Sequence, residues 1–128
     1  MPDNPPPRVV VIDDDRDHLA YLTDLLRGAG YDVTGFHDAA AAMRMLGRDG
    51  ANLVVTDIFM PDMDGFEVLR NLRDIDASIP VIAVSLTRTE DERLFLQSIK
   101  RMGAVDSLAR PIDAAAMLAA VAGALRKY

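Results

Sequence analysis

Three stretches of the sequence are continuously apolar and rich in β-branched residues, which is typical of strands buried on both faces of a parallel sheet. They lie at Val9–Ile12, Leu53–Val55 and Val81–Val84. Two further candidate strands, around residues 31–36 and 105–108, mix apolar with polar or small residues. We therefore expect the first three strands in the centre of a sheet and the other two at its edges.

Apolar residues at helical spacing follow each of these strands. These segments cover residues 19–26, 43–46, 68–75, 95–102 and 117–125. Asp38 is expected to cap the second helix, and Thr89 with Glu92 forms the capping box of the fourth. Five strands alternating with five helices predict an α/β fold, a three-layer α/β/α sandwich with a five-stranded parallel sheet in the order 2-1-3-4-5.

The composition narrows the function classes. The chain has 128 residues, 50% of them hydrophobic, which suits a single domain, and it has no cysteine for disulfides or thiol chemistry. Its net charge of −6, with no run of more than two Lys or Arg residues, argues against direct nucleic-acid binding. No apolar run approaches the roughly 20 residues of a membrane span, and the N-terminus lacks a secretory signal. We expect a soluble, cytoplasmic protein.

Acidic residues stand at the ends of two predicted central strands. Asp13 and Asp14 follow the first strand, and Asp57 follows the third. Neighbouring parallel strands end at the same edge of a sheet, so these carboxylates are expected to converge at the switch point of the topology. Oxygen ligands without His or Cys suit Mg²⁺. Asp15, by contrast, is expected to cap the first helix.

Four motifs resemble one known family. The stretches VVVIDDD, VVTDIFMPDMDG, PVIAVS and ARPID, in this order and spacing, are similar to the receiver domain of bacterial two-component response regulators. The resemblance extends from Arg8 to about Leu125 and implies a flavodoxin-like fold. We therefore expect a receiver domain over residues 8–128, preceded by a disordered Pro-rich arm at residues 1–7.

The resemblance also implies the roles of the site residues. Asp57 would accept a phosphoryl group from a sensor histidine kinase or a histidine phosphotransfer protein. Asp14 would bind Mg²⁺ directly, Asp13 through a water molecule, and the Phe59 backbone carbonyl would be a further ligand. The Ser85 hydroxyl would hydrogen-bond a phosphoryl oxygen. The downstream target or output domain would bind the face formed by the fourth helix, fifth strand and fifth helix. A homodimer is a further possibility that the sequence does not decide.

Three positions depart from the family pattern. Arg110 replaces the usual lysine, Ser107 replaces an aromatic residue, and Leu86 replaces a small one. The Arg110 guanidinium is expected to face Asp57 and its phosphoryl group, where a planar fork is not equivalent to an ammonium. By resemblance, the Arg110–Pro111 peptide bond should be cis.

The remaining polar candidates have simpler interpretations. Asp62 and Asp64 are expected to be solvated loop and helix-cap residues, because they lie beyond Pro61. His18 and His37 stand alone in the sequence and are expected at the surface, not as phosphorelay histidines.

Three functions are compatible with these features. The favoured one is a phosphorylation-controlled switch that is not an enzyme but assists its own aspartyl phosphorylation and dephosphorylation. The second is a degenerate receiver that acts as a phosphorylation-independent interaction module, for which the three departures argue. The third is a magnesium phosphohydrolase resembling haloacid dehalogenases. Asp13 and Asp15 have the spacing of that group, but the residues after them do not complete its pattern.

Overall fold

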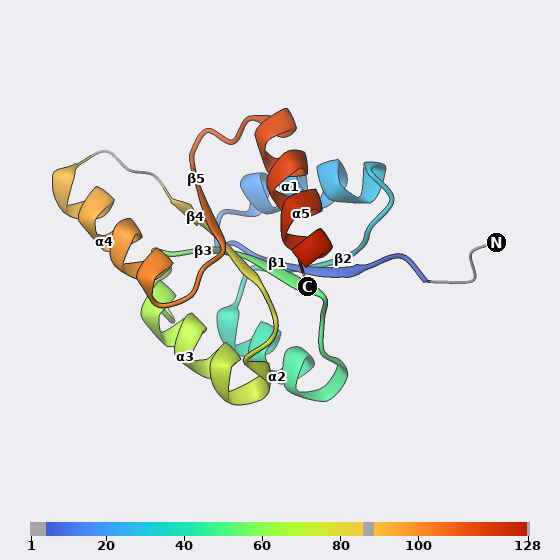
Figure 1. Cartoon of the computed structure of the whole chain (residues 1–128), viewed down its shortest axis with the longest axis horizontal. Coiled ribbons are helices and arrows are strands. Elements are labelled where there is room, and N and C mark those ends of the chain that lie inside the picture. Colours follow the sequence, from blue (N-terminus) through green and yellow to red (C-terminus); the bar gives the residue numbers. More distant parts are fainter. Residues whose placement is uncertain (1–4, 86–88, 128) are drawn as a thin grey trace.

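Strands and helices alternate along the chain in the computed structural model, which describes residues 5–85 and 89–127 (Figure 1). The strands are β1 (Arg8–Ile12), β2 (Asp32–Phe36), β3 (Leu53–Asp57), β4 (Val81–Ser85) and β5 (Asp106–Ala109). The helices are α1 (Arg16–Gly28), α2 (Ala39–Asp49), α3 (Gly65–Asp76), α4 (Glu90–Arg101) and α5 (Ala114–Lys127). Each predicted element is present, so the expected α/β alternation is confirmed.

The strands form one parallel sheet in the order β2-β1-β3-β4-β5. This is the predicted order, with β2 and β5 at the edges. Ile12 pairs with Thr56, and Asp57 pairs with Val84, so the carboxyl ends of β1, β3 and β4 lie next to one another. The residues that follow these strands therefore meet at one edge of the sheet.

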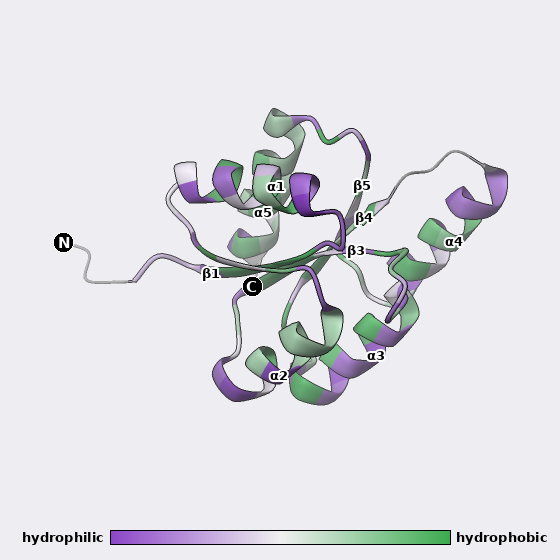
Figure 2. Cartoon of the chain, turned by 180° about the vertical axis from the view of Figure 1, so that it is seen from behind, coloured by the Kyte–Doolittle hydropathy of each residue, from purple (hydrophilic) through white to green (hydrophobic). Residues whose placement is uncertain are grey.

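Helices cover both faces of the sheet, which gives the three layers seen in Figure 1. Alternate residues of β1 serve the two cores: Val10 and Ile12 pack with α2, α3 and α4, whereas Val9 and Val11 pack with α1 and α5. Figure 2 shows the strands as an apolar layer between helices that mostly carry both polar and apolar residues, whereas α5 is largely apolar. The continuous apolar runs of the sequence are thus explained by burial on both sides.

Side-chain caps begin all five described helices, and at α5 Asp113 Oδ2 accepts a hydrogen bond from the Ala116 N–H. Asp15, Asp38 and Asp64 accept hydrogen bonds from the first turns of α1, α2 and α3, and Thr89 forms the capping box of α4 with Glu92. These capping predictions are confirmed.

Gly65 begins α3 because the backbone there lies close to two side chains. A Cβ atom at this position would approach Ile58 Cγ2 to 2.7 Å and Ile99 Cδ1 to 3.1 Å. The Gly65 N–H donates to the Ile58 carbonyl at 2.8 Å, which fixes the loop between β3 and α3. The glycine therefore supplies space at this turn.

The N-terminal segment joins the sheet at its last proline. Pro5–Pro7 have no regular secondary structure, and the Pro7 carbonyl accepts a hydrogen bond from the Asp32 N–H at 3.0 Å. Residues 1–4 of the expected arm lie outside the described residues.

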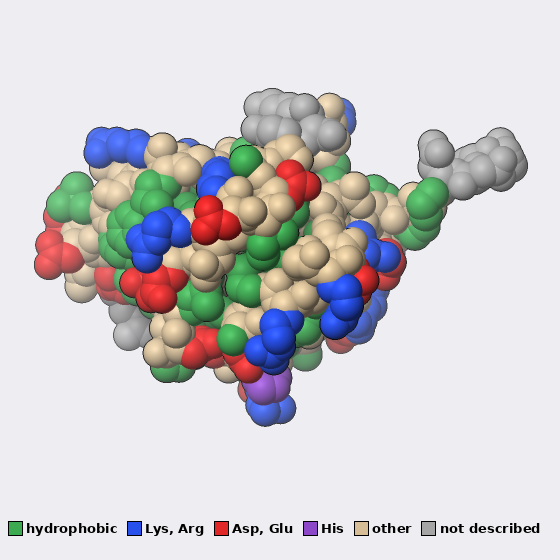
Figure 3. Space-filling model, turned by 90° about the horizontal axis from the view of Figure 1, so that it is seen from below, with side chains coloured by type: hydrophobic (Ala, Val, Ile, Leu, Met, Phe, Trp, Pro, Cys, Tyr) green, Lys and Arg blue, Asp and Glu red, His purple; other side chains and the backbone are tan. Residues whose placement is uncertain are grey.

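Acidic and basic side chains are mixed over the face shown in Figure 3, and neither sign forms a continuous field there. In the part of the chain that the structure describes, every helix is too short or too polar to cross a membrane.

Candidate functional site

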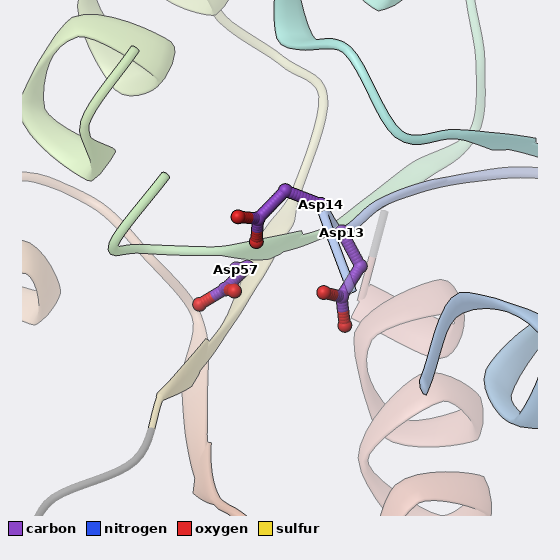
Figure 4. A group of neighbouring side chains, drawn as sticks. All are labelled: Asp13, Asp14 and Asp57. Atoms are coloured by element: carbon purple, nitrogen blue, oxygen red, sulfur yellow. The ribbon is translucent and has the colours of Figure 1, made fainter. Parts of the chain in front are cut away.

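Three carboxylates meet where β1 and β3 end (Figure 4). One oxygen from each of Asp13, Asp14 and Asp57 lies within 4.8 Å of the other two. Asp13 and Asp57 are buried, whereas Asp14 is exposed. The structure therefore brings together the three acidic residues that the sequence predicts to converge, at the edge of the sheet predicted for a ligand.

Asp15 stands apart from this cluster because its side chain caps α1. It accepts hydrogen bonds from the backbone N–H groups of Asp17 and His18. Its own N–H donates to Asp13 Oδ1 at 3.0 Å. Of the three adjacent aspartates, Asp15 thus caps α1, whereas Asp13 and Asp14 belong to the carboxylate cluster.

The loop after Asp57 places Phe59 at the rim of the site. The Phe59 N–H points to Asp57 Oδ1 at 3.4 Å, and the Ile58 N–H donates to the Val84 carbonyl at 3.1 Å. Phe59 is 41% exposed, and its ring lies 5.0 Å from the Phe95 ring of α4, measured between centroids. Phe95 in turn makes an edge contact with Phe66. An aromatic contact therefore connects this loop to α4.

Ser85 brings a hydroxyl to the end of β4. The side chain is fully buried, and its Oγ is one of two buried side-chain polar atoms without a hydrogen-bond partner in the described structure. Ser85 follows Val84, the residue that pairs with Asp57. A buried donor without a partner costs about 1–3 kcal/mol, so the site contains a hydroxyl suited to an oxygen of a bound group.

Arg110 contacts a different carboxylate from the one that the resemblance implies. Its Nη2 donates to both oxygens of Asp13, at 2.9 Å and 2.7 Å. Among the described residues its side chain makes no hydrogen bond to Asp57; the expectation that it faces Asp57 is not met. Asp13 is the more deeply buried of the two neighbouring acids, and the guanidinium forms a charge-assisted pair with it. The Arg110–Pro111 peptide bond is cis, as predicted.

His18 belongs to the site, and its expected surface position is wrong. Its side chain is only 15% exposed, and Nδ1 contacts Asp13 Oδ2 and the Arg110 guanidinium. His18 is the third residue of α1, and helical side chains lean toward the N-terminus, so the imidazole reaches back over Asp13. The spacing of His18 from the Asp15 cap is the sequence signal that would have predicted the contact of His18 with Asp13. His37 is exposed, as expected.

Asp64 is a helix cap, as predicted, and Asp62 has a structural contact that the sequence did not reveal. Asp62 Oδ2 accepts a hydrogen bond from the Ala39 N–H at the start of α2, at 3.1 Å. Neither belongs to the group of carboxylates that meet at Asp57.

Of the two other departures, the structure describes only Ser107. Ser107 is half-buried in β5, where its N–H donates to Asp106 Oδ1 at 2.8 Å. Leu86 lies outside the described residues.

Burial and neighbouring groups shift the pKa values of the two buried carboxyl groups in opposite directions. Burial, with the charge of Asp13 as a second cause, raises the pKa of Asp57 from 3.8 to about 6, although Arg110 opposes the shift. Burial also acts to raise the pKa of Asp13, but the contact with His18, the Asp15 N–H and the Arg110 charge outweigh it and lower that pKa. Asp13 is therefore the more readily ionised acid, and the Asp57 carboxylate is the one destabilised by its surroundings.

Because the pKa of Asp57 is raised, Asp57→Asn should stabilise the metal-free protein by an amount that depends on pH. Native Asp57 binds a proton up to about pH 6, whereas unfolded Asp57 releases it near pH 4. The parent therefore loses stability relative to the variant as pH rises between these values. Across that window the stability difference should shift in favour of the variant by about 3 kcal/mol.

Urea unfolding in EDTA, from below pH 4 to above pH 7, measures this difference. Asp24→Asn, at an exposed position of α1, is the matched control. A stability difference that stays constant across the window would contradict the raised pKa of Asp57.

The donor set fits a hard divalent cation. The group of Asp13, Asp14 and Asp57 offers carboxylate oxygens, and Mg²⁺ prefers oxygen ligands while keeping several of its waters. The exposed Asp14 makes no hydrogen bond or ion pair with the described residues, so its oxygens are free for a metal ion. The cluster is therefore a candidate metal centre.

Comparison with known proteins identifies the family. The family model of the response regulator receiver domain matches residues 9–122. The transcriptional regulatory protein PrrA of Mycobacterium tuberculosis is 37% identical over 121 residues, which cover 94% of this chain and 51% of PrrA. The chain belongs to the response regulator receiver domain family, a signalling family of two-component systems and not a class of conventional enzymes. It spans about half the length of the first curated relatives that it matches.

Solved structures share the fold of this chain. Full-length FixJ from B. japonicum has a TM-score of 0.86 and 30% identity, over 94% of this chain and 58% of FixJ. A CheY-like receiver domain protein from Methanospirillum hungatei has a TM-score of 0.84 over 95% of both chains, at 23% identity. The second likeness shows that the flavodoxin-like receiver fold persists at low sequence identity.

Proposed function

We propose that this chain is a phosphorylation-controlled switch that accepts a phosphoryl group on Asp57 from a phosphohistidine donor. The observation that carries the proposal is a buried Asp57 whose neighbours supply two further carboxylates and a buried hydroxyl without a partner, Ser85 Oγ. A sensor histidine kinase or a histidine phosphotransfer protein would be the donor, in a cytoplasmic two-component pathway.

The proposed transfer is a displacement at phosphorus. An Asp57 carboxylate oxygen forms the new P–O bond while the P–N bond of the donor phosphohistidine breaks. The donor nitrogen keeps the electron pair of that bond. Positioning and electrostatic stabilisation supply most of the catalysis in such transfers. Asp57 ends a strand, which holds the attacking oxygen in place. The raised pKa of Asp57 means that nearby positive charge would stabilise its carboxylate form.

Asp13, Asp14, Asp57 and the Phe59 carbonyl would hold Mg²⁺ in this proposal. When bound, the ion supplies the positive charge that offsets negative charge on the transferring oxygens. The protein residues then have separate tasks. Asp14 is free to coordinate, whereas Asp13 is shared with Arg110 and is suited to contact through water.

Ser85 and Arg110 would bind the transferred group. The buried Ser85 hydroxyl gains a hydrogen-bond partner when a phosphoryl oxygen arrives. Arg110, anchored on Asp13, supplies fixed positive charge beside the site. This charge does not require the guanidinium to leave Asp13.

The output would be read on the α4–β5–α5 face. Lys100 and Arg101 are exposed there, and Asp106 is half-exposed. The Phe59–Phe95 ring contact joins the loop that follows the phosphoryl acceptor to α4, so a shift of this loop reaches that face directly. A downstream protein or an output domain would be the partner.

Intact mass spectrometry tests the proposed function. With Mg²⁺ and a small acyl phosphate, the protein should gain one phosphoryl group, and EDTA should prevent the gain. Hydroxylamine should remove it, because the product is a mixed anhydride. Failure to form the adduct, together with no spectral change on adding beryllofluoride, would instead support an interaction module that does not depend on phosphorylation.

A further inference from the structure

Helix α1 contacts the segment that carries Arg110 at two points. His18 Nδ1 accepts a hydrogen bond from Arg110 Nε at 3.2 Å and lies 2.7 Å from Nη2. One turn further along α1, the Tyr21 hydroxyl donates to the Ile112 carbonyl at 3.2 Å. The first helix thus holds both the guanidinium and the backbone after the cis bond, although these residues are far apart in sequence.

The hydrogen bonds occupy one edge of the guanidinium. Nε donates to His18, and Nη2, which carries two N–H groups, lies within hydrogen-bond distance of both His18 and Asp13. Nη1 makes no hydrogen bond to a described residue.

There is a physical reason for the Arg110 guanidinium to have a second acceptor besides Asp13. A guanidinium prefers to span two acceptors, and with Asp13 alone it is free to swing until it also spans the neighbouring Asp57. That carboxylate is close enough for the Arg110 charge to act on it. The His18 ring nitrogen beside Asp13 gives the Nε–Nη2 edge a second contact without adding another carboxylate to the cluster.

We propose that His18 is a positioning residue for Arg110: together with Asp13 it holds the Nε–Nη2 edge, which leaves Nη1 for a phosphoryl oxygen on Asp57. The proposal deepens the proposed function and rests on it. His18 is then a partner specific to arginine at position 110, because a lysine ammonium at this position would not need a second acceptor.

The rate of adduct formation in a double-mutant cycle tests this role. His18→Ala should slow the gain of the phosphoryl group by about tenfold, the scale of loss expected for a misplaced group near the reacting atoms. In an Arg110→Lys background the same change should have little effect. His18→Asn, which restores a short acceptor, should recover much of the rate. His37→Ala, at the exposed second histidine, is the matched control.

A second measurement needs no phosphoryl donor. In metal-free protein the Arg110 Nε–H resonance should be protected from exchange with water in the parent and should lose this protection in His18→Ala. Equal slowing of phosphorylation by His18→Ala in the parent and in the Arg110→Lys background, or an unchanged Nε–H resonance, would overturn the positioning role. A parent that forms no adduct but shows a protected Nε–H would remove the proposed function and leave only the arginine anchor.

Discussion

Asp57→Asn is expected to abolish the phosphoryl adduct completely. The asparagine amide keeps the size of the side chain but lacks the nucleophilic carboxylate oxygen. No other acid has the same surroundings in the described structure: Asp13 is paired with Arg110, and Asp14 is exposed. Time courses of intact mass, with the same Mg²⁺ and acyl phosphate for parent and variant, measure the effect.

Asp62 and Asp64 provide the matched controls for this result. They follow Asp57 within the same loop, but they bond to the starts of α2 and α3. Asp62→Asn and Asp64→Asn should therefore still gain the phosphoryl group. An adduct that persists in Asp57→Asn would show that another residue is the acceptor, and peptide mapping would identify it.

The sequence predicts the fold well because its local and global signals agree. Each central strand is continuously apolar, and both faces of the sheet prove to be covered by helices. The edge strands β2 and β5 carry the polar residues that mark them in the sequence. Strand order follows from these two edges, and the caps at Asp15, Asp38, Asp64 and Thr89 fix where the helices start.

The acidic cluster is also predictable, because backbone topology alone brings the ends of β1 and β3 together. The side-chain partners are not predictable in this way. Which of two adjacent carboxylates pairs with Arg110 depends on its rotamer and on the local charges. No short sequence pattern encodes that pairing. His18 looks like an isolated histidine until the direction of helical side chains is considered.

The Arg110–Asp13–His18 contacts distinguish the two adjacent acids Asp13 and Asp14. The residue pattern alone places both acids beside Asp57, and only the resemblance implies that Asp14 is the direct metal ligand. In the structure, Asp13 is nearly inaccessible and already has cationic and imidazole neighbours, whereas Asp14 has none among the described residues. The binding of a metal ion should therefore depend most strongly on Asp14.

Asp14→Ala is accordingly expected to weaken Mg²⁺ binding by about a hundredfold or more, close to 2.7 kcal/mol. Mg²⁺ gives up its hydration water reluctantly, and it usually relies on only one or two carboxylates in a protein site. With Asp14 removed, the remaining acids are Asp13, which is bound by Arg110, and Asp57, whose pKa is raised by burial. Neither compensates for the loss of the free carboxylate.

Calorimetric titration of Mg²⁺ into the parent and Asp14→Ala, at a pH above 7, measures this loss. At that pH Asp57 is ionised in both proteins, so its protonation does not contribute to the difference. Asp24→Ala removes one exposed carboxylate from α1 and controls for the change in net charge. Asp13→Asn should weaken binding less than Asp14→Ala, because Asp13 is already shared with Arg110 and would contact the ion only through water. Equal affinities for the parent and Asp14→Ala would place the metal elsewhere, and a larger loss in Asp13→Asn would show that the arginine-bound acid is the principal ligand.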